Sequence, residues 1–372
     1  MWASRTSATS PRSRTPPPWT TYARSPPPSS VASADIDVLI IGAGHAGLGV
    51  AARLKERGRH ALVVDAKPRI GDTWRERWSS LRLFTPRFMN TLPGLRFPDG
   101  ADPFPGTEEV ADYQERYASE RGLDVRMSTR LTRLRREGQG FAAEIGRDLV
   151  RARYAVVATG AHQVPRIPAF ASRLDAGVLQ LHSRDYGRAG SLPAGPVLVV
   201  GARNSGVEIA AELARTHEVT LAIGSRSTHA PARWRSPTWW RIAQLRNSLS
   251  HGWEPPGRWP WPIKPPAGRW IEVDLSRAEH EGLLRTAPRA VGAVGEAIRF
   301  ADGRELRPRT VIWATGFRVD DSWIDAPSSD RGVAIGRHRR GPLPGLYVLR
   351  VGLLASLYWG GLAVAADIAR RR

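Results

Sequence analysis

The chain has 372 residues, 41% of them hydrophobic, and no apolar run long enough to cross a bilayer, which indicates a globular protein with room for two domains. It contains no cysteine, which excludes disulfides, thiolate metal sites and thiol–disulfide redox chemistry within the chain, and we assign no metal site. Its net charge of +20 comes almost entirely from arginines spread along the sequence without a nucleic-acid-binding motif, so we expect a cytoplasmic protein with a solvated basic surface and no nucleic-acid partner.

Residues 1–34 combine several arginines with proline runs such as 16–18 and contain no acidic residue. This composition is too poor in apolar side chains to form a core, so we expect a disordered tail. A wrongly assigned start codon explains the same composition equally well.

The first strong pattern is a glycine motif between a strand and a helix. An apolar strand over 38–41 is followed by Gly42, Gly44 and Gly47, and apolar residues then recur at helical spacing over 46–57. In a dinucleotide-binding turn, the first glycine makes the tight turn, the second lets the backbone approach a pyrophosphate, and the third lets the helix pack closely.

The residues around this motif complete a nucleotide site. The helix starts at His45 and Ala46, whose backbone N–H groups would face the phosphates, and we treat the imidazole of His45 as incidental. A second strand over 60–64 ends in Asp65, where the ribose-binding acid is expected about 20 residues after the motif. This order predicts a dinucleotide site; a glycine turn in an ordinary parallel sheet is the alternative.

Two apolar strands, over 154–160 and 311–317, each contain Ala-Thr-Gly at their end, so that Gly160 and Gly316 occupy equivalent positions. Small residues there would let the chain cross between domains close to a cofactor, although any apolar strand can end in such a turn. The repetition agrees with two similar nucleotide-binding units.

A second glycine motif follows the apolar strand at 196–200. Its candidate ligand-binding residues are Gly201, Asn204, Ser205 and Gly206. A helix over 207–215 and a strand over 218–223 follow, and the strand leads to Arg226 rather than to an acid. An arginine suits a ribose 2′-phosphate, so we predict NADPH in preference to NADH. The alternative is a surface arginine in an arginine-rich chain.

Arg203 stands where a glycine normally lets the backbone approach the pyrophosphate of the second nucleotide. Its side chain would either crowd the ligand or turn outward and grip a phosphate. The sequence leaves both outcomes open, so the second site is less secure than the first.

Half of the 14 tryptophans lie between Trp234 and Trp270, within a proline-rich excursion over 231–270. This segment could roof a large apolar substrate, touch a membrane surface peripherally, or pack on its own domain. Further on, the apolar residues over 351–364 are too few to span a bilayer and predict a buried terminal helix.

Several segments resemble the flavin-containing monooxygenases. They are Gly71 to Arg75, Trp78, 81–86, 92–94 with 97–98, and 182–186. The resemblance extends over roughly 36–372. It is strongest to bacterial flavoproteins often labelled as involved in potassium transport and weaker to plant indole-3-pyruvate monooxygenases.

The resemblance implies an α/β fold of two doubly wound, Rossmann-like domains, with FAD bound in the larger and NADPH in the smaller. The FAD domain would comprise 35–165 and 306–372, and the inserted NADPH domain 166–305. Carried onto this sequence, FAD would contact Gly42, Gly44, His45, Ala46, Gly47, Asp65, Trp74, Leu83, Thr85, Gly160, Gly316 and Gly361, with Asp367 closing the pocket. NADPH would contact Gly201, Asn204, Ser205, Gly206 and Arg226.

The implied chemistry is reduction of FAD by NADPH, reaction with O2 to a flavin C4a-hydroperoxide, and transfer of one oxygen atom to a small organic substrate. We name no catalytic side chain, and we expect His182 to be a linker residue. Two alternatives stay open: an NADPH oxidase or reductase without oxygen transfer, and a degenerate FAD-binding regulatory protein. The sequence determines neither the substrate nor the oligomeric state.

Overall fold

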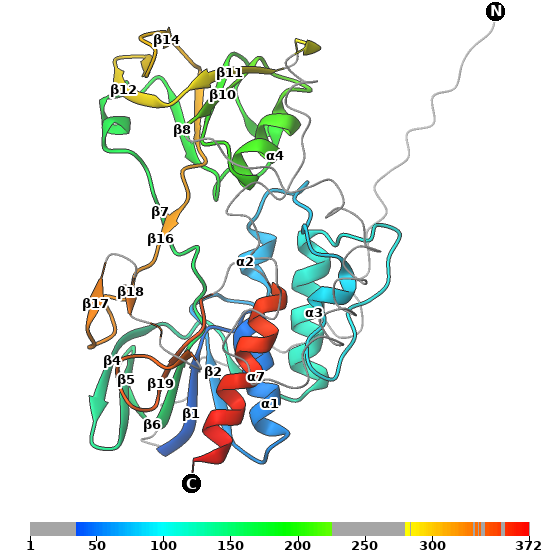
Figure 1. Cartoon of the computed structure of the whole chain (residues 1–372), viewed down its shortest axis with the longest axis vertical. Coiled ribbons are helices and arrows are strands. Elements are labelled where there is room, and N and C mark those ends of the chain that lie inside the picture. Colours follow the sequence, from blue (N-terminus) through cyan, green and yellow to red (C-terminus); the bar gives the residue numbers. More distant parts are fainter. Residues whose placement is uncertain are drawn as a thin grey trace, which may run out of the picture.

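The computed structural model describes residues 35–224, 280–282, 284–329, 332–333, 335, 339–350 and 354–371. The predictions for the N-terminal tail, for Arg226 and for the excursion at 231–270 therefore lie outside the described residues. Within them, the chain forms two lobes, each built on its own β-sheet (Figure 1).

The larger lobe contains a seven-stranded sheet of order β3-β2-β1-β6-β5-β4, with β19 also pairing with β6. Strands β1, β2, β3, β6 and β19 run parallel, whereas β4 and β5 are added antiparallel. The strands are β1 (Asp35–Ile41), β2 (Ala61–Val64), β3 (Asp124–Arg126), β4 (Leu131–Glu137), β5 (Gly140–Ile145), β6 (Asp148–Val157) and β19 (Leu346–Val348).

Both faces of this sheet are buried, which is why β1 is apolar throughout its second half. Val38 and Ile40 pack into a core formed with the helices, whereas Leu39 and Ile41 face a second core that includes Phe141 of β5. The alternation follows the two-residue period of a strand.

Three helices lie together over one face of the sheet: α1 (His45–Lys55), α3 (Thr107–Glu120) and α7 (Leu354–Arg370) (Figure 1). The predicted helix after the first glycine motif is confirmed, and it ends at Lys55 shortly before Gly58, whose φ is +68°. The predicted terminal helix is also present, and Val364 and Ile368 are buried in it.

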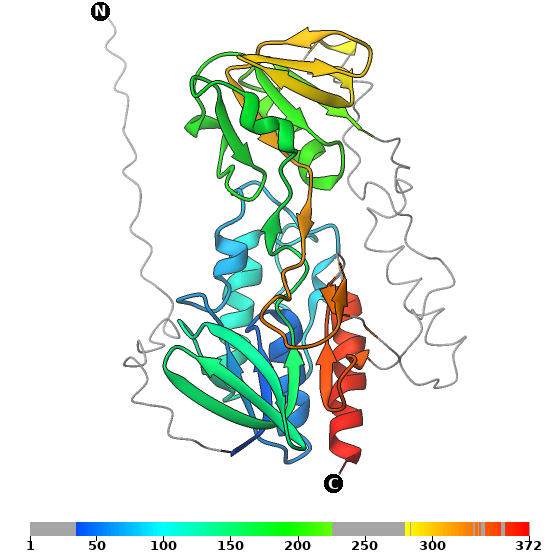
Figure 2. The ribbon, with the colours of Figure 1, turned by 90° about the vertical axis from the view of Figure 1, so that its left-hand side faces the viewer.

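The smaller lobe contains a five-stranded parallel sheet of order β11-β10-β9-β15-β8. Its strands are β8 (Leu179–His182), β9 (Val197–Val200), β10 (Val219–Ile223), β11 (Leu284–Pro288) and β15 (Thr310–Trp313). Helix α4 (Asn204–Leu213) follows the second glycine motif and begins three residues before the predicted start. An antiparallel sheet of β12 (Ala290–Val294), β13 (Ala297–Phe300) and β14 (Glu305–Leu306), which the sequence did not predict, caps the far end (Figure 2).

The lobes are joined by β7 (Val164–Pro165) and β16 (Phe317–Arg318), which pair antiparallel (Figure 2). Each linker strand follows one Ala-Thr-Gly segment, so the chain does cross between lobes at these small residues. The expected domain boundary at 305/306 needs a correction. Strand β15 pairs with β8 and β9, so the smaller lobe continues through Trp313 before the chain returns.

A second connection comes from the larger lobe itself. Trp78 is 3% exposed and packs in the core of the smaller lobe with Tyr186 and Val207. Close by, the hydroxyl of Ser80 donates a hydrogen bond to Glu212, which lies on α4. The two lobes therefore share part of one core. Among the described residues, no helix combines the length and apolarity needed to cross a bilayer.

Candidate functional site

The two glycine motifs fold into the same turn. Gly42 has φ +115° and Gly201 has φ +110°, both in the region that favours glycine. A Cβ on Gly42 would lie 2.5 Å from the carbonyl oxygen of Ala158, and one on Gly201 would lie 2.4 Å from that of Ala314. Each Ala-Thr-Gly segment thus lies directly against one glycine turn, which accounts for the repetition seen in the sequence.

The third glycine of each motif allows the helix to pack onto its own turn. A Cβ on Gly47 would lie 1.9 Å from the carbonyl oxygen of Gly42, and one on Gly206 would lie 1.7 Å from that of Gly201. Neither position has room for any side chain. These two glycines therefore let α1 and α4 each pack closely against the glycine turn that precedes it.

The middle position differs between the motifs in side chain but not in backbone. Gly44 has φ −82° and ψ −175°, and Arg203 has φ −86° and ψ −173°. No atom lies within 4 Å of a Cβ built on Gly44, and the side chain of Arg203 is exposed. Arg203 is thus accommodated without backbone strain, and its side chain is directed to solvent.

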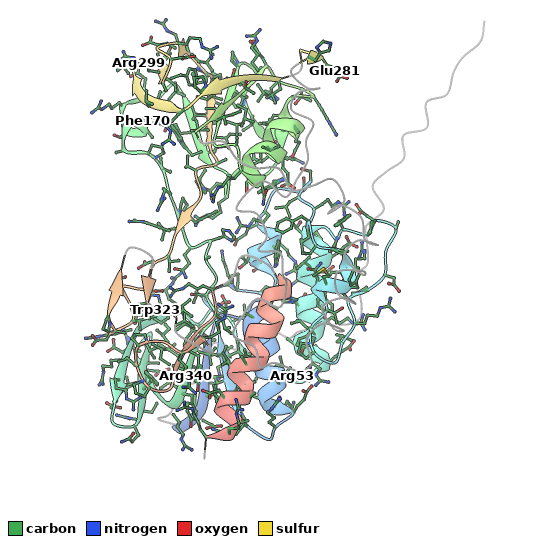
Figure 3. The ribbon with its side chains drawn as sticks, in the orientation of Figure 1. Arg53, Phe170, Glu281, Arg299, Trp323 and Arg340 are labelled. Carbon is green, nitrogen blue, oxygen red and sulfur yellow. The ribbon has the colours of Figure 1, made fainter. Side chains whose placement is uncertain are left out.

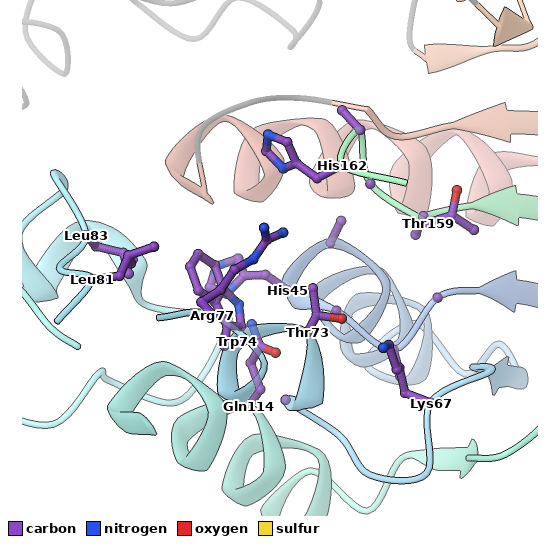
Figure 4. A pocket seen from close by; sticks show the side chains of 18 of the residues that line it. His45, Lys67, Thr73, Trp74, Arg77, Leu81, Leu83, Gln114, Thr159 and His162 are labelled. Atoms are coloured by element: carbon purple, nitrogen blue, oxygen red, sulfur yellow. The ribbon is translucent and has the colours of Figure 1, made fainter. Parts of the chain in front are cut away.

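A cavity of about 600 Å³ opens in front of the N-termini of α1 and α4 and is lined from both lobes. Figure 4 shows part of the wall that the larger lobe provides. Its size is typical of ligand and cofactor sites. The predicted site residues on its wall are Gly42, Gly44, His45, Ala46, Asp65, Trp74, Leu83, Thr85, Gly160, Asn204 and Ser205. Gly47, Gly201, Gly206, Gly316 and Gly361 are not part of the wall, and Arg226 lies outside the described residues.

Gly361 and Asp367, which were predicted to complete the flavin pocket, do not line the cavity. Gly361 lies where α7 crosses α1, with its Cβ position 3.3 Å from Cγ2 of Val50. Asp367 lies three residues before the end of α7, where it accepts hydrogen bonds from the Tyr347 hydroxyl (2.6 Å) and from Arg340 (2.6 Å), which is labelled in Figure 3. The expectation that Asp367 closes the pocket is corrected, because α7 carries it to the far end of the lobe.

The Asp65 carboxylate is held by the backbone at the end of β2. Its Oδ2 accepts the N–H of Ala43 (2.7 Å), and its Oδ1 accepts the N–H of Lys67 (2.9 Å). These bonds tie the carboxylate to the glycine turn and hold it in the cavity wall. Each oxygen keeps a lone pair that can accept a ribose hydroxyl.

Two short segments position the part of the wall that contains Trp74 and Thr85. Trp74 lies on α2 (Asp72–Arg75), which begins after Gly71, a residue with φ +87° whose Cβ position is 2.7 Å from Cα of Ala111 in α3. The loop containing Thr85 is fixed by Asn90, which is fully buried. Thr85 Oγ1 donates to Asn90 Oδ1 (2.7 Å), and Asn90 Nδ2 donates back to the Thr85 carbonyl (3.0 Å).

Three buried side chains on the wall have polar atoms without a hydrogen-bond partner: both ring nitrogens of His45, Nε2 of Gln114 and Nε1 of Trp78. Burial lowers the pKa of His45 to about 3, so its imidazole is neutral. Buried polar atoms without partners are unusual, and a bound water or ligand can supply the missing hydrogen bond. The glycine turn, the helix N-terminus, Asp65 and these groups together fit a dinucleotide cofactor.

The sequence did not identify these groups, and only one carried a signal. Gln114 lies on the buried stripe of α3 with Val110, Tyr113 and Tyr117, where a polar residue is out of pattern. His45 was treated as incidental because its burial depends on elements distant in sequence. Trp78 was noticed only as part of the family resemblance.

His182 was expected to be a linker residue, but it ends β8 of the smaller lobe and contacts the residue before linker strand β16. It is 3% exposed, its Nε2 lies 3.0 Å from the carbonyl oxygen of Gly316, and its Nδ1 accepts the N–H of Arg184 (3.2 Å). Both ring nitrogens are occupied, and the ring stands edge-on against Phe317 at 4.8 Å. His182 therefore fastens the returning linker strand rather than facing a substrate.

Glu208 of α4 lines the cavity, and burial next to Glu212 raises its pKa to about 8 from 4.5. Folding therefore adds a proton between these values, and the contribution of Glu208 to stability falls as the pH rises from about 5 to about 8. Between about pH 5 and about pH 8, we expect the melting temperature of Glu208→Gln to fall less than that of the wild-type protein. Glu108→Gln, at a side chain 68% exposed, is the control and should keep the wild-type slope. If melting temperature depends on pH equally in all three proteins, Glu208 does not have a raised pKa.

A pair of glycine turns of one geometry, each at the carboxyl edge of a parallel sheet, defines a fold with two dinucleotide-binding sites. The chain belongs to the family described as pyridine nucleotide-disulphide oxidoreductase, whose model matches residues 39–252. It is an enzyme of this oxidoreductase family.

Individual proteins agree with the family. The chain is 37% identical to an uncharacterized CzcO-like oxidoreductase of Geobacillus kaustophilus, over 84% of this chain and 90% of that protein. It is 29% identical to the indole-3-pyruvate monooxygenase YUCCA1 of Oryza sativa subsp. japonica, over 77% and 78%. A flavin-containing monooxygenase from Stenotrophomonas maltophilia has the same fold, with a TM-score of 0.74, 24% identity, and coverage of 91% and 98%. The resemblance and the predicted fold class are confirmed.

Proposed function

We propose that the protein is a FAD- and NADPH-dependent monooxygenase of the cytoplasm that transfers one oxygen atom from O2 to a small organic substrate. The observation that carries the proposal is the cavity onto which both glycine-motif helices, α1 and α4, open. Two dinucleotides bound at these helices would meet in one enclosed space. Hydride transfer between them requires such proximity.

The residues of the chain divide between the two cofactors. The turn from Gly42 to Ala46 and Asp65 would hold the pyrophosphate and adenosine of FAD, and its flavin would lie toward Trp74 and Leu83. Asn204 and Ser205, at the start of α4, would face NADPH. Bound FAD supplies the capacity to accept a hydride and to react, once reduced, with O2.

Part of the cavity wall supports this chemistry by limiting contact with water. Leu81, Leu83 and Phe84 provide an apolar surface on one side. Glu208 is a neutral acid at neutral pH because burial raises its pKa to about 8, so it can donate a hydrogen bond without adding a negative charge. An apolar surface limits the water that can reach a reactive oxygen species. Elsewhere the wall is cationic, with Lys67, Arg69, Arg77 and Arg82.

The alternatives differ in what accepts the electrons. A bacillithiol disulfide reductase from Staphylococcus aureus shares the fold, with a TM-score of 0.68 at 13% identity. The present chain contains no cysteine, so it has no thiol of its own for disulfide exchange. An NADPH oxidase that releases peroxide stays the main competitor, and a protein that binds FAD without being reduced is the other.

Anaerobic mixing of the FAD-loaded protein with NADPH is expected to bleach the oxidised flavin absorbance faster than mixing with NADH. Arg226→Ala should reduce this preference by about 10-fold, because a charge-assisted hydrogen bond contributes about 1.5–3 kcal/mol. Arg285→Ala, at a side chain 72% exposed in the same lobe, is the control.

After O2 is admitted, isotopically labelled oxygen should appear in the product of an accepted substrate. Peroxide that accounts for all NADPH consumed, with every substrate, would instead identify an oxidase. A flavin that stays oxidised with both nucleotides would refute the second site.

A further inference from the structure

The imidazole of His45 is placed where a cofactor would be bound. His45 is the first residue of α1, directly after Gly44, and is only 4% exposed. Figure 4 shows it reaching from α1 into the part of the cavity that holds Trp74 and Gln114. Neither of its nitrogens has a partner, although the side chain is enclosed.

The hydrogen-bonding capacity of this ring restricts the group that it can bind. A neutral imidazole has one N–H donor and one lone-pair acceptor. Burial lowers the pKa of His45 to about 3, so the ring keeps both functions throughout the physiological range. Phosphate oxygens only accept, and they would leave the acceptor nitrogen unpaired. A hydroxyl group, which both donates and accepts, pairs with either nitrogen.

The order of groups in FAD identifies which hydroxyls are near. The pyrophosphate belongs at the N-terminus of α1, with the adenosine ribose on the Asp65 side. In Figure 4, Lys67, which follows Asp65 in the chain, lies on one side of His45, and Trp74 lies on the other. On that side, the group attached to the pyrophosphate is the ribityl chain, which carries a hydroxyl at each of its 2′, 3′ and 4′ carbons.

Gln114 adds an independent observation. It comes from a different helix, α3, is 1% exposed, and has an amide Nε2 without a partner. Two neutral, buried side chains from separate elements, each with unpaired nitrogen, thus contribute to the cavity wall. They form a polar site in a wall that also includes Trp74, Leu83 and the side chain of Arg77.

We propose that His45 and Gln114 bind the ribityl hydroxyls of FAD, with His45 acting as donor and acceptor and Gln114 as donor. The inference rests on the proposed placement of FAD at the first motif. It does not depend on whether the reduced flavin transfers oxygen.

The test is the dissociation constant of FAD, measured by flavin fluorescence on protein from which FAD has been removed. His45→Leu should weaken binding about 10-fold or more, because it removes both hydrogen-bonding functions. His45→Gln, whose amide also donates and accepts, should restore most of the affinity. His60→Leu, at a side chain 70% exposed, is the matched control and should bind as the wild type does.

FAD analogues lacking the 2′-, 3′- or 4′-hydroxyl of the ribityl chain complete a double-mutant cycle. The wild-type protein should lose about 10-fold for at least one analogue, and His45→Leu should lose no more for that analogue than for FAD. The proposal would be overturned if the wild-type protein bound FAD and all three analogues equally well. It would also be overturned if the effects of His45→Leu and of removing the hydroxyl were fully additive. The wild-type titrations test the proposal even if His45→Leu fails to fold.

Failure of the underlying placement gives a different pattern. If FAD occupies the second motif, a side chain introduced at Gly44 will leave FAD affinity unchanged, and His45→Leu will have no effect. If only oxygen transfer fails, the binding cycle will be intact while labelled oxygen does not reach any product.

Discussion

Gly44→Val is expected to abolish FAD binding while the protein without FAD keeps its wild-type melting temperature. The backbone at Gly44 is extended, with φ −82°, and no atom lies within 4 Å of an added Cβ, so the fold accepts a side chain. The branched side chain would fill the space in front of α1 that the pyrophosphate needs. Losing two charge-assisted hydrogen bonds of about 1.5–3 kcal/mol each predicts a loss of affinity of about 100-fold or more.

The measurement is the FAD content of the purified variant together with its melting temperature. Gly47→Ala provides the contrast, because its Cβ would lie 1.9 Å from the carbonyl oxygen of Gly42 and should prevent folding. A Gly44→Val protein that binds FAD as tightly as the wild type would remove FAD from the first motif.

Asp321→Ala is expected to destabilise the larger lobe by about 3–5 kcal/mol, because it leaves the charge of Arg350 buried without its partner. The side chains of Arg350 and Asp321 are 6% and 2% exposed, and they form an ion pair. The Asp321 carboxylate also accepts the N–H of Val333 (2.6 Å). The free energy of unfolding in urea measures the effect.

Glu218→Ala is the matched control for this ion pair. Its partner is Arg285, and both side chains are more than half exposed, at 55% and 72%. Such a surface pair contributes about 0–1 kcal/mol, so the variant should unfold close to the wild-type midpoint. If Asp321→Ala is no more destabilising than Glu218→Ala, the buried pair does not stabilise the lobe.

Much of the fold was predictable because the glycine motifs combine two independent constraints. Gly42 needs a positive φ and Gly47 needs room for a neighbouring carbonyl, so glycine at both positions specifies the turn and the packing of the next helix. The domain boundary was misplaced because the strand over 310–313 is buried on both faces and its sequence would suit either sheet. The small sheet from β12 to β14 was missed because its short strands contain alanine and glycine, which carry little strand signal.

The candidate site was predictable only where backbone geometry defines it. Asp65 follows a strand at the spacing that a dinucleotide motif requires, and the structure does place it on the cavity wall. Gln114 and Glu208 reach the same wall from helices whose positions depend on tertiary packing. Their unusual chemistry, an unpaired amide and a neutral acid, arises from burial that no local pattern encodes.

The indole of Trp78 limits how freely the parts of this enzyme can be exchanged. It belongs to the larger lobe by sequence, fills the interior of the smaller lobe, and forms part of the cavity wall. A transplanted nucleotide-binding lobe must therefore offer a socket for this ring, or the recipient will lose packing and part of its wall together. Chimeras within the family should fold best when the transplanted lobe has a matching socket for this indole. The unit that can be exchanged intact is therefore the pair of lobes.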